Sequence, residues 1–225
     1  MGRSSIGGMP SGGRPRAAPP VRSPGRPRLY EPDAERNRIL ASALEVLQRS
    51  GGEEATVADI LDESGLSTRA FYRHFETKED VIRALYRRDS ESFGKHLRRR
   101  IADAPPRKGL ELWMNEALGL AYDRRRAERV SALSSPMVQR VVAGSEEQRL
   151  GLGMLMQPLR DVIVAGLANG DFPAAQPDRD VLTIGAMAFD VVAWARTGRM
   201  TLTRRQAVDH LLRFALPALE GPKET

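Results

Sequence analysis

A short segment in the first third of the chain is basic although its surroundings are acidic. Residues 67–75 carry Arg69 and Arg73 and no carboxylate, whereas residues 33–80 as a whole carry 11 acidic and 6 basic side chains. A segment that excludes carboxylates suits contact with phosphate groups, because a carboxylate would repel them. A guanidinium group can also donate two hydrogen bonds to the edge of a guanine. The residue types therefore predict a nucleic-acid contact on this segment.

The helices that would hold this segment are marked by their starts and stops. A Thr-x-x-Asp pattern at residues 56–59, repeated at 77–80, predicts two helix starts of the capping-box type. Gly65 separates two short helices, and an apolar stripe over residues 39–47 predicts a supporting helix in front of them. One supporting helix followed by two short helices around a glycine turn is the helix-turn-helix pattern.

The second short helix has two different faces. Phe71 and Phe75 share one side of a helical wheel and are expected to attach the helix to its scaffold. The side chains on or beside the opposite face would be free to enter the major groove of DNA. They are Thr68, Arg69, Tyr72 and Arg73.

These residues carry a family resemblance. Residues 56–80, TVADILDESGLSTRAFYRHFETKED, resemble the DNA-binding signature of the TetR-type (TetR/AcrR) family of transcriptional regulators, and residues 38–43 resemble its first helix. The match covers roughly a fifth of the chain, and its Tyr-x-His-Phe-x-x-Lys ending is specific. Two positions depart from the usual pattern: Leu61 replaces a common alanine, and Arg69-Ala70 stands where a small residue and a glycine are frequent.

The resemblance implies a bacterial, cytoplasmic transcriptional regulator that lies on the nucleoid when it is bound to DNA. It implies a homodimer that acts as a repressor on a palindromic operator in double-stranded DNA and is released by a small-molecule effector, expected to be largely apolar. In this family three N-terminal helices bind DNA, and a long fourth helix leads to a variable helical domain that dimerises and holds the effector. The sequence leaves repression and activation both open.

The resemblance also implies roles for individual side chains. By match to the family, Tyr72, His74 and Lys78 would contact phosphates, as would the hydroxyl side of the caps at Thr56 and Ser67. The candidates for base edges are the remaining polar residues of the second short helix. They are Thr68, Arg69 and Arg73.

Composition narrows the class of protein further. The chain has 225 residues, of which 41% are hydrophobic, no cysteine and three histidines, so thiol chemistry is excluded and no metal site or cofactor is expected. There is no Gly-x-Ser-x-Gly motif and no paired-carboxylate segment, and we expect no enzyme. No segment shows sustained strand alternation, which predicts an all-α fold. The longest apolar candidate, Ile184 to Ala195, is too short to span a bilayer, and no secretory block opens the chain.

The N-terminal segment carries the whole excess of positive charge. Residues 1–30 hold six arginines and no acidic residue, and the rest of the chain is balanced at 29 basic against 29 acidic residues. Rich in glycine and proline, this segment is expected to be a disordered basic arm. It is compatible with an arm that contacts DNA, with an organelle transit peptide or with an idle leader. Its prolines and glycines disfavour the transit peptide, and we favour the DNA arm.

The pattern divides the chain into four parts: a disordered basic arm over residues 1–32, a helix-turn-helix domain over 33–80, a linking helix over 81–104, and a helical effector-binding and dimerisation domain over 105–221. In the last part, Glu146–Ala168 and Asp180–Thr197 predict two helices that would pair across a dimer as a four-helix bundle. The glycines of the first of these helices, Gly151, Gly153 and Gly166, are interpreted as close approach at the dimer seam.

Methionine and aromatic side chains of the C-terminal part suggest where an effector would lie, because such side chains suit a plastic apolar cavity. For any single one of these residues an ordinary core position is the favoured interpretation. Asp190, a carboxylate within an apolar helix, would bind a ligand group, pair across the dimer or face a wet groove. The candidate lining residues are Trp113, Met114, Tyr122, Met154, Met187, Asp190 and Trp194, with Met156 and Phe189 beside them.

One other class of protein fits the same residues. An effector-independent architectural or constitutive DNA-binding protein would use the basic arm and the helix-turn-helix in the same way. Such a protein would not need the large C-terminal helical part. Release of a palindromic DNA fragment by a small molecule separates the two alternatives.

Overall fold

The computed structural model describes residues 32–51 and 55–222, so most of the expected basic arm (residues 1–32) lies outside the described residues. Over the described ranges the fold is all-α, as the sequence predicts, with helices and no strand. The helices are α1 (Pro32–Arg49), α2 (Val57–Ser64), α3 (Thr68–His74), α4 (Lys78–Ile101), α5 (Pro106–Tyr122), α6 (Arg124–Leu133), α7 (Pro136–Val142), α8 (Glu146–Asn169), α9 (Pro177–Arg196) and α10 (Arg204–Glu220).

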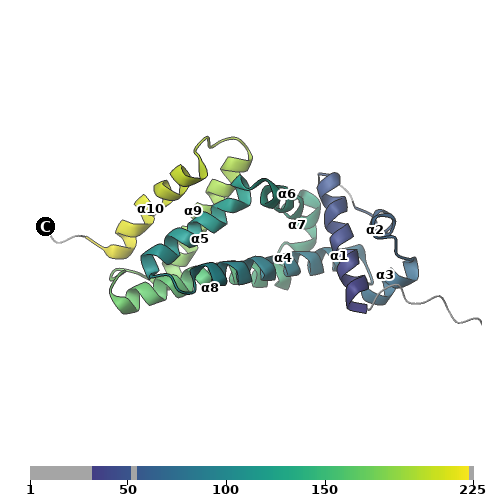
Figure 1. Ribbon diagram of the computed structural model, residues 1–225, viewed down its shortest axis with the longest axis horizontal. Helices are drawn as coiled ribbons and strands as arrows, with labels where there is room; N and C mark the ends of the chain where they lie inside the picture. The colour runs from purple at the N-terminus through teal and green to yellow at the C-terminus, as the bar shows by residue number, and fades with distance from the viewer. Residues whose placement is uncertain (1–31, 52–54, 223–225) are drawn as a thin grey trace, which may run out of the picture.

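The long helix α4 joins the two ends of the molecule. It begins beside α1, α2 and α3 and runs to the region of α5, α9 and α10 (Figure 1). Helix α8 lies alongside α4 for much of this length, and α6 and α7 lie between α5 and α1 (Figure 1). Helices α1, α2 and α3 thus lie at one end of α4, and a larger group of helices lies at the other.

The buried side chains form two separate cores. The N-terminal core contains residues of α1, α2 and α3, the first turns of α4, and α6 and α7, with Phe71, Leu85 and Val138 fully buried. The C-terminal core contains the end of α4 together with α5, α8, α9 and α10, around Trp113 and Phe172. Helix α4 contributes to both cores, so it is the element through which they are joined.

Helices α6 and α7 contribute to the N-terminal core, although the sequence places them in the C-terminal part. Ala132, Leu133, Met137 and Val138 belong to the N-terminal core, and α6 lies directly against α1. These helices are short, and their apolar faces pack against α1 and the start of α4. The division of the packing therefore differs from the expected boundary at residues 104–105.

Helix α8 differs in two ways from the sequence-based expectation. Within the described residues, it is long and apolar enough to cross a membrane by length and composition alone, which the search for a single apolar stretch missed. It nevertheless packs against α4, α5 and α9. A Cβ added at Gly151 would lie 2.8 Å from Ser90 Oγ, and one at Gly166 would lie 2.0 Å from the Phe172 ring. These two glycines are explained by packing within the chain, not by a dimer seam.

Candidate functional site

The helix-turn-helix is built from the local signals that the sequence shows. Thr56 Oγ1 accepts a hydrogen bond from the Asp59 backbone N–H at 3.2 Å, and Asp59 Oδ2 in return accepts one from the Thr56 N–H at 2.9 Å. Gly65 ends α2 in the left-handed region at φ 64°, a conformation that glycine adopts without steric cost. Ser67 then caps α3 by accepting from the Ala70 N–H. The turn between the two helices is thus set by three consecutive local interactions.

Helix α3 is anchored on one face and open on the other. Phe71 and Phe75 are 0% and 6% exposed, and their rings lie 6.1 Å apart between centroids. On the other face Tyr72 is 57% exposed, although it is a large aromatic side chain. The polar residues that the sequence assigns to DNA contact are exposed beside it, namely Thr68, Arg69 and Arg73.

A buried carboxylate on α1 holds the end of α3, and sequence reasoning did not identify it. Glu35 is 5% exposed, and its Oε2 accepts hydrogen bonds from Arg73 at 2.6 Å and from His74 at 3.1 Å. The hydrogen bond to His74, together with the charge and hydrogen bond of Arg73, lowers the pKa of Glu35 against the opposing effect of burial. The orientation of α3 relative to α1 is therefore fixed by a charged contact as well as by its phenylalanines.

This contact changes the interpretation of two predicted site residues. The His74 side chain is 10% exposed and is directed to Glu35, so it has an internal partner in place of the expected phosphate. Arg73 is 41% exposed and has the same partner. Arg69, in contrast, has no ion-pair partner among the described residues. The structure thus separates Arg69, predicted to contact a base, from Arg73 and His74, which share Glu35 as a partner.

The remaining predicted phosphate contacts lie at the starts of helices α2, α3 and α4. Thr56 and Ser67 are exposed N-caps of α2 and α3, with their hydroxyl groups engaged in capping. Lys78 is half-buried in the first turn of α4, directly after the Thr77 cap. Backbone N–H groups at helix starts favour anions, which is compatible with a phosphate at these positions.

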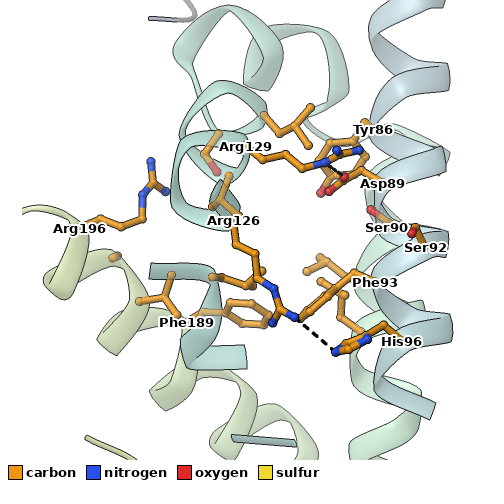
Figure 2. A pocket seen from close by; sticks show the side chains of 18 of the residues that line it. Tyr86, Asp89, Ser90, Ser92, Phe93, His96, Arg126, Arg129, Phe189 and Arg196 are labelled. Atoms are coloured by element: carbon orange, nitrogen blue, oxygen red, sulfur yellow. Dashed lines mark hydrogen bonds and ion pairs between the residues drawn. The ribbon is translucent and has the colours of Figure 1, made fainter. Parts of the chain in front are cut away.

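A cavity of about 700 Å³ lies between the two cores. Its walls come from α4, α5, α6, α7, α8 and α9, and Figure 2 shows Arg126 extending into it above Phe189 and beside Phe93. Volumes of this size are typical of small-molecule sites. Its polar lining residues include Asp89, His96, Arg99, Arg126, Arg129 and Arg196.

The cavity is not lined by the residues that the sequence proposes, apart from Phe189. Trp113 and Met114 are fully buried in the C-terminal core, and the Tyr122 hydroxyl donates to the Leu202 carbonyl at 2.9 Å. Met154 and Met187 are half-buried elsewhere, and Met156 packs under Gly185. Asp190 and Trp194 are exposed on the outer side of α9. Methionine and aromatic side chains are typical of a ligand cavity, but here they lie on helix faces that are either buried in the core or exposed to solvent.

A second charged network lies beside the cavity. Glu116 of α5 is 6% exposed and accepts hydrogen bonds from His96 and Arg126 at 2.8 Å each and from Arg100 at 3.3 Å. Burial raises the pKa of Glu116, but the hydrogen bonds and charges of Arg126 and His96 outweigh burial and bring it to about 2. The carboxylate thus ties α4, α5 and α6 together at the wall of the cavity.

One signal in the sequence would have pointed to this wall. On α4 the residues Tyr86, Asp89, Phe93 and His96 recur every three or four positions, followed by Arg99. This spacing places them on one helix face, and a face that mixes charges with aromatic rings does not suit an ordinary core. The basic run Arg98–Arg100 at the end of α4 supplies Arg99 to the cavity and Arg100 to Glu116.

Comparison with known proteins agrees with this geometry. Residues 39–85 match the family model of bacterial regulatory proteins, tetR family. Among curated proteins, no sequence matches the chain.

Three solved structures illustrate the shared fold. A transcriptional regulator from Pseudomonas aeruginosa PAO1 has a TM-score of 0.68 at 20% identity, over 85% of this chain and 93% of that one. FadR from Bacillus subtilis, in complex with stearoyl-CoA, has a TM-score of 0.64 at 16% identity, over 81% and 98%. NalD, the secondary repressor of the MexAB-OprM efflux pump in Pseudomonas aeruginosa, has 0.61 at 17%, over 84% and 96%.

Identities this low establish the fold alone, whereas the family match falls on the helix-turn-helix itself. Over residues 39–85 the chain is therefore similar to bacterial regulatory proteins of the tetR family, and this similarity falls on the helix-turn-helix.

Proposed function

We propose that the protein is a repressor that binds a palindromic operator as a homodimer and leaves it when a small molecule occupies the cavity between the two cores. The observation that carries the proposal is α3, a short helix whose apolar face is buried and whose outer face carries exposed Arg69 and Tyr72. A helix held in this way can enter the major groove without losing its own packing.

The exposed residues suit different parts of the DNA. Arg69 is exposed and unpaired within the described residues, and it is the first candidate for a bidentate contact with a guanine. Thr68 lies beside Arg69. Arg73 would contact a base only after it leaves its ion pair with Glu35. Tyr72 and Lys78, with the caps at Thr56 and Ser67, are the candidates for phosphate contacts, which position the helix on any sequence. The contribution of His74 is then to orient α3 through Glu35.

A dimer is supported by apolar side chains that a monomer leaves exposed on α8 and α9. Leu182 is 70% exposed, and Trp194, Leu150, Leu167 and Val164 are each at least 40% exposed. Two such helices from each subunit form a four-helix bundle in which these side chains are covered. A twofold dimer also explains why the operator should be a palindrome.

Release by an effector is supported by where the cavity lies. Its walls include Tyr86 on α4 and Leu133 on α6, which both pack in or against the N-terminal core, and Phe189 on α9, which belongs to the other end. A ligand that fills the cavity contacts both cores and biases their relative position. The structure of FadR, a protein of this fold, was determined in complex with stearoyl-CoA, which is compatible with a small-molecule effector for this protein.

Selection from a random duplex library tests the proposal. The full-length protein should enrich a palindromic sequence, and sedimentation of the complex should give two chains per site. The Arg69→Ala variant should lose discrimination at particular base pairs by about 1–3 kcal/mol. The control Arg98→Ala, on an exposed part of α4, should leave the selected sequence unchanged. Enrichment of no sequence would favour the architectural DNA-binding protein.

A further inference from the structure

The cavity between the two cores is strongly unbalanced in charge. Within the described part of the chain, four arginines line it against a single carboxylate, Asp89. They come from three different helices, so the imbalance is not a consequence of one basic helix. They are Arg99 on α4, Arg126 and Arg129 on α6, and Arg196 on α9.

Only part of this charge is neutralised within the protein. Arg129 forms an ion pair with Asp89, and Arg126 with Glu116, as Figure 2 shows for the first pair. Glu116 is shared, because His96 and Arg100 also bond to it. Arg99 and Arg196 have no ion-pair partner among the described residues, and both are exposed where the cavity meets solvent. The cavity therefore has uncompensated positive charge at its edge.

The rest of the wall is apolar. Phe93 and Phe189 flank the Arg126 side chain (Figure 2). Leucines from three helices, α5, α6 and α8, also line the cavity. Such a wall favours the burial of an alkyl or aromatic body at about 25 cal/mol for each Å² removed from water. The apolar lining residues include Phe93, Leu120, Leu133, Leu152, Leu155 and Phe189.

We propose that the effector is an organic anion with an apolar body, whose negative charge is attracted by the uncompensated charges of Arg99 and Arg196 at the edge of the cavity and whose body lies against Phe93 and Phe189. This inference rests on the proposed function, since it takes the cavity as the effector site, and it goes further by fixing the charge of the effector. It replaces the largely apolar effector expected from the sequence.

Other ligand chemistries fit the cavity less well. An uncharged ligand would take the guanidinium groups partly out of water without giving them an acceptor, which costs free energy. A cation would be repelled by the arginines, because Asp89 and Glu116 are already bonded to Arg129 and Arg126. A carboxylate or a phosphate instead accepts charge-assisted hydrogen bonds from arginine.

Calorimetry on the full-length protein without DNA tests the charge of the ligand. The probes are decanoate, decanol and decylamine, which share a chain length and differ in charge. Decanoate should bind at least about tenfold more tightly than decanol, because a charge-assisted hydrogen bond is worth about one such factor. Decanoyl-CoA is the second anionic probe, and tighter binding of it than of decanoate would identify a phosphate-bearing ligand as the source of the anion. Equal binding of decanol and decanoate, or binding of neither anion, would overturn the proposal.

Arginine variants with matched neighbours test the position of the anion. Arg196→Gln and Arg99→Gln should each weaken binding of the tighter anionic probe by about fivefold to tenfold. Arg199→Gln and Arg98→Gln remove an equal charge from exposed positions outside the cavity lining and should have little effect. All four positions are exposed, so folding is expected to persist, which circular dichroism verifies. Equal losses in lining and control variants would show that only the general charge attracts the probe and would overturn the site.

Operator release is measured separately, by fluorescence anisotropy of the DNA selected above. Binding of the anion through Arg99 and Arg196 without release of the operator would leave this inference intact and contradict the effector step of the proposed function. If decanol releases the operator, and the arginine variants release it as the wild type does, the effector step of the proposed function would stand and this inference would be contradicted.

Discussion

The helix-turn-helix end and the cavity end of the protein position their polar side chains in different ways. At the first, caps such as Thr56 and Ser67 and the turn at Gly65 act between residues at most five positions apart. At the second, Glu116 joins residues that are 10 to 20 positions away along the chain. Apart from the contacts of Glu35 with Arg73 and His74, local interactions shape the exposed face of α3, whereas the cavity depends on how whole helices pack. The two regions should therefore respond differently to substitution.

The largest expected effect is on the free energy of unfolding, and it compares the two cores. Phe71→Ala, in the N-terminal core, should lower the free energy of unfolding by about 3–5 kcal/mol, because it leaves a large cavity at a fully buried site. Phe172→Ala is the matched change in the C-terminal core, where Phe172 is also fully buried. Urea unfolding followed by circular dichroism measures both.

Tryptophan fluorescence shows whether the cores unfold together. Trp113 lies in α5 and Trp194 lies in α9, so tryptophan fluorescence reports on the C-terminal end alone. Because α4 belongs to both cores, Phe71→Ala should shift the fluorescence transition together with the dichroism. A fluorescence transition left at the wild-type urea concentration would contradict this and show two independent folding units.

The next effect concerns the charged network beside the cavity. Because the pKa of Glu116 is about 2 in place of 4.5, its ionised form stabilises the fold by about 3 kcal/mol at neutral pH. A lowered pKa contributes stability above the unfolded-state pKa, and this contribution is lost as pH falls from about 4.5 toward 2. Glu116→Gln should therefore be less stable than wild type at pH about 7, and the difference should shrink as the pH falls through this range.

The matched control for this network is Glu111→Gln on the same helix. Glu111 pairs only with Lys108 at an exposed position, and exposed pairs contribute about 0–1 kcal/mol. Parallel denaturation curves at neutral and acidic pH measure both variants. A stability difference between wild type and Glu116→Gln that is the same at every pH would show that Glu116 acts through packing and not through its charge.

The same contrast explains what could be predicted from the sequence. The all-α fold, the helix bounds and the exposed face of α3 follow from caps, glycines and apolar periodicity, which act within a few residues. Glu35 was missed because its partners Arg73 and His74 lie 38 and 39 positions away. The cavity residues were missed because Trp113 and Met114 have the composition of a ligand site, and only the packing of α5 shows that they face the core.

A smaller effect tests the dimer surface. Leu182→Asp places a charge at a side chain that is 70% exposed in the single chain, so the fold of the subunit should not change. Burying an unpaired carboxylate in the proposed bundle should weaken dimerisation by about 2 kcal/mol or more. Phe214→Asp, on α10 and 55% exposed, is the control outside that bundle. Sedimentation equilibrium measures both, and an unchanged dimer in Leu182→Asp would remove α9 from the interface.

Loss of a local cap should have a modest effect. Thr56→Ala removes the hydroxyl that accepts from the Asp59 N–H and should lower the free energy of unfolding by about 1 kcal/mol. Thr56→Ser keeps the hydroxyl and should recover most of this loss. Chemical denaturation compares the three proteins. If the serine variant is as unstable as the alanine variant, the methyl group of Thr56 and not its hydroxyl is what stabilises α2.

The smallest effect on stability is expected for deletion of residues 1–30, which lie outside the described residues. The fold of the body should persist, because residues 1–30 are rich in glycine, proline and arginine and hold few side chains that could form a core. The deletion removes six arginines from each chain. If about two or three of them per subunit release counterions from DNA, the slope of log affinity against log salt concentration should become shallower by about 4 to 5 units for a dimer. Binding should weaken most at low salt, where screening is least.

Titration of the operator at several salt concentrations measures this slope. An unchanged slope would favour the idle leader over the DNA arm, and loss of folding would contradict both, because neither gives residues 1–30 a part in the core.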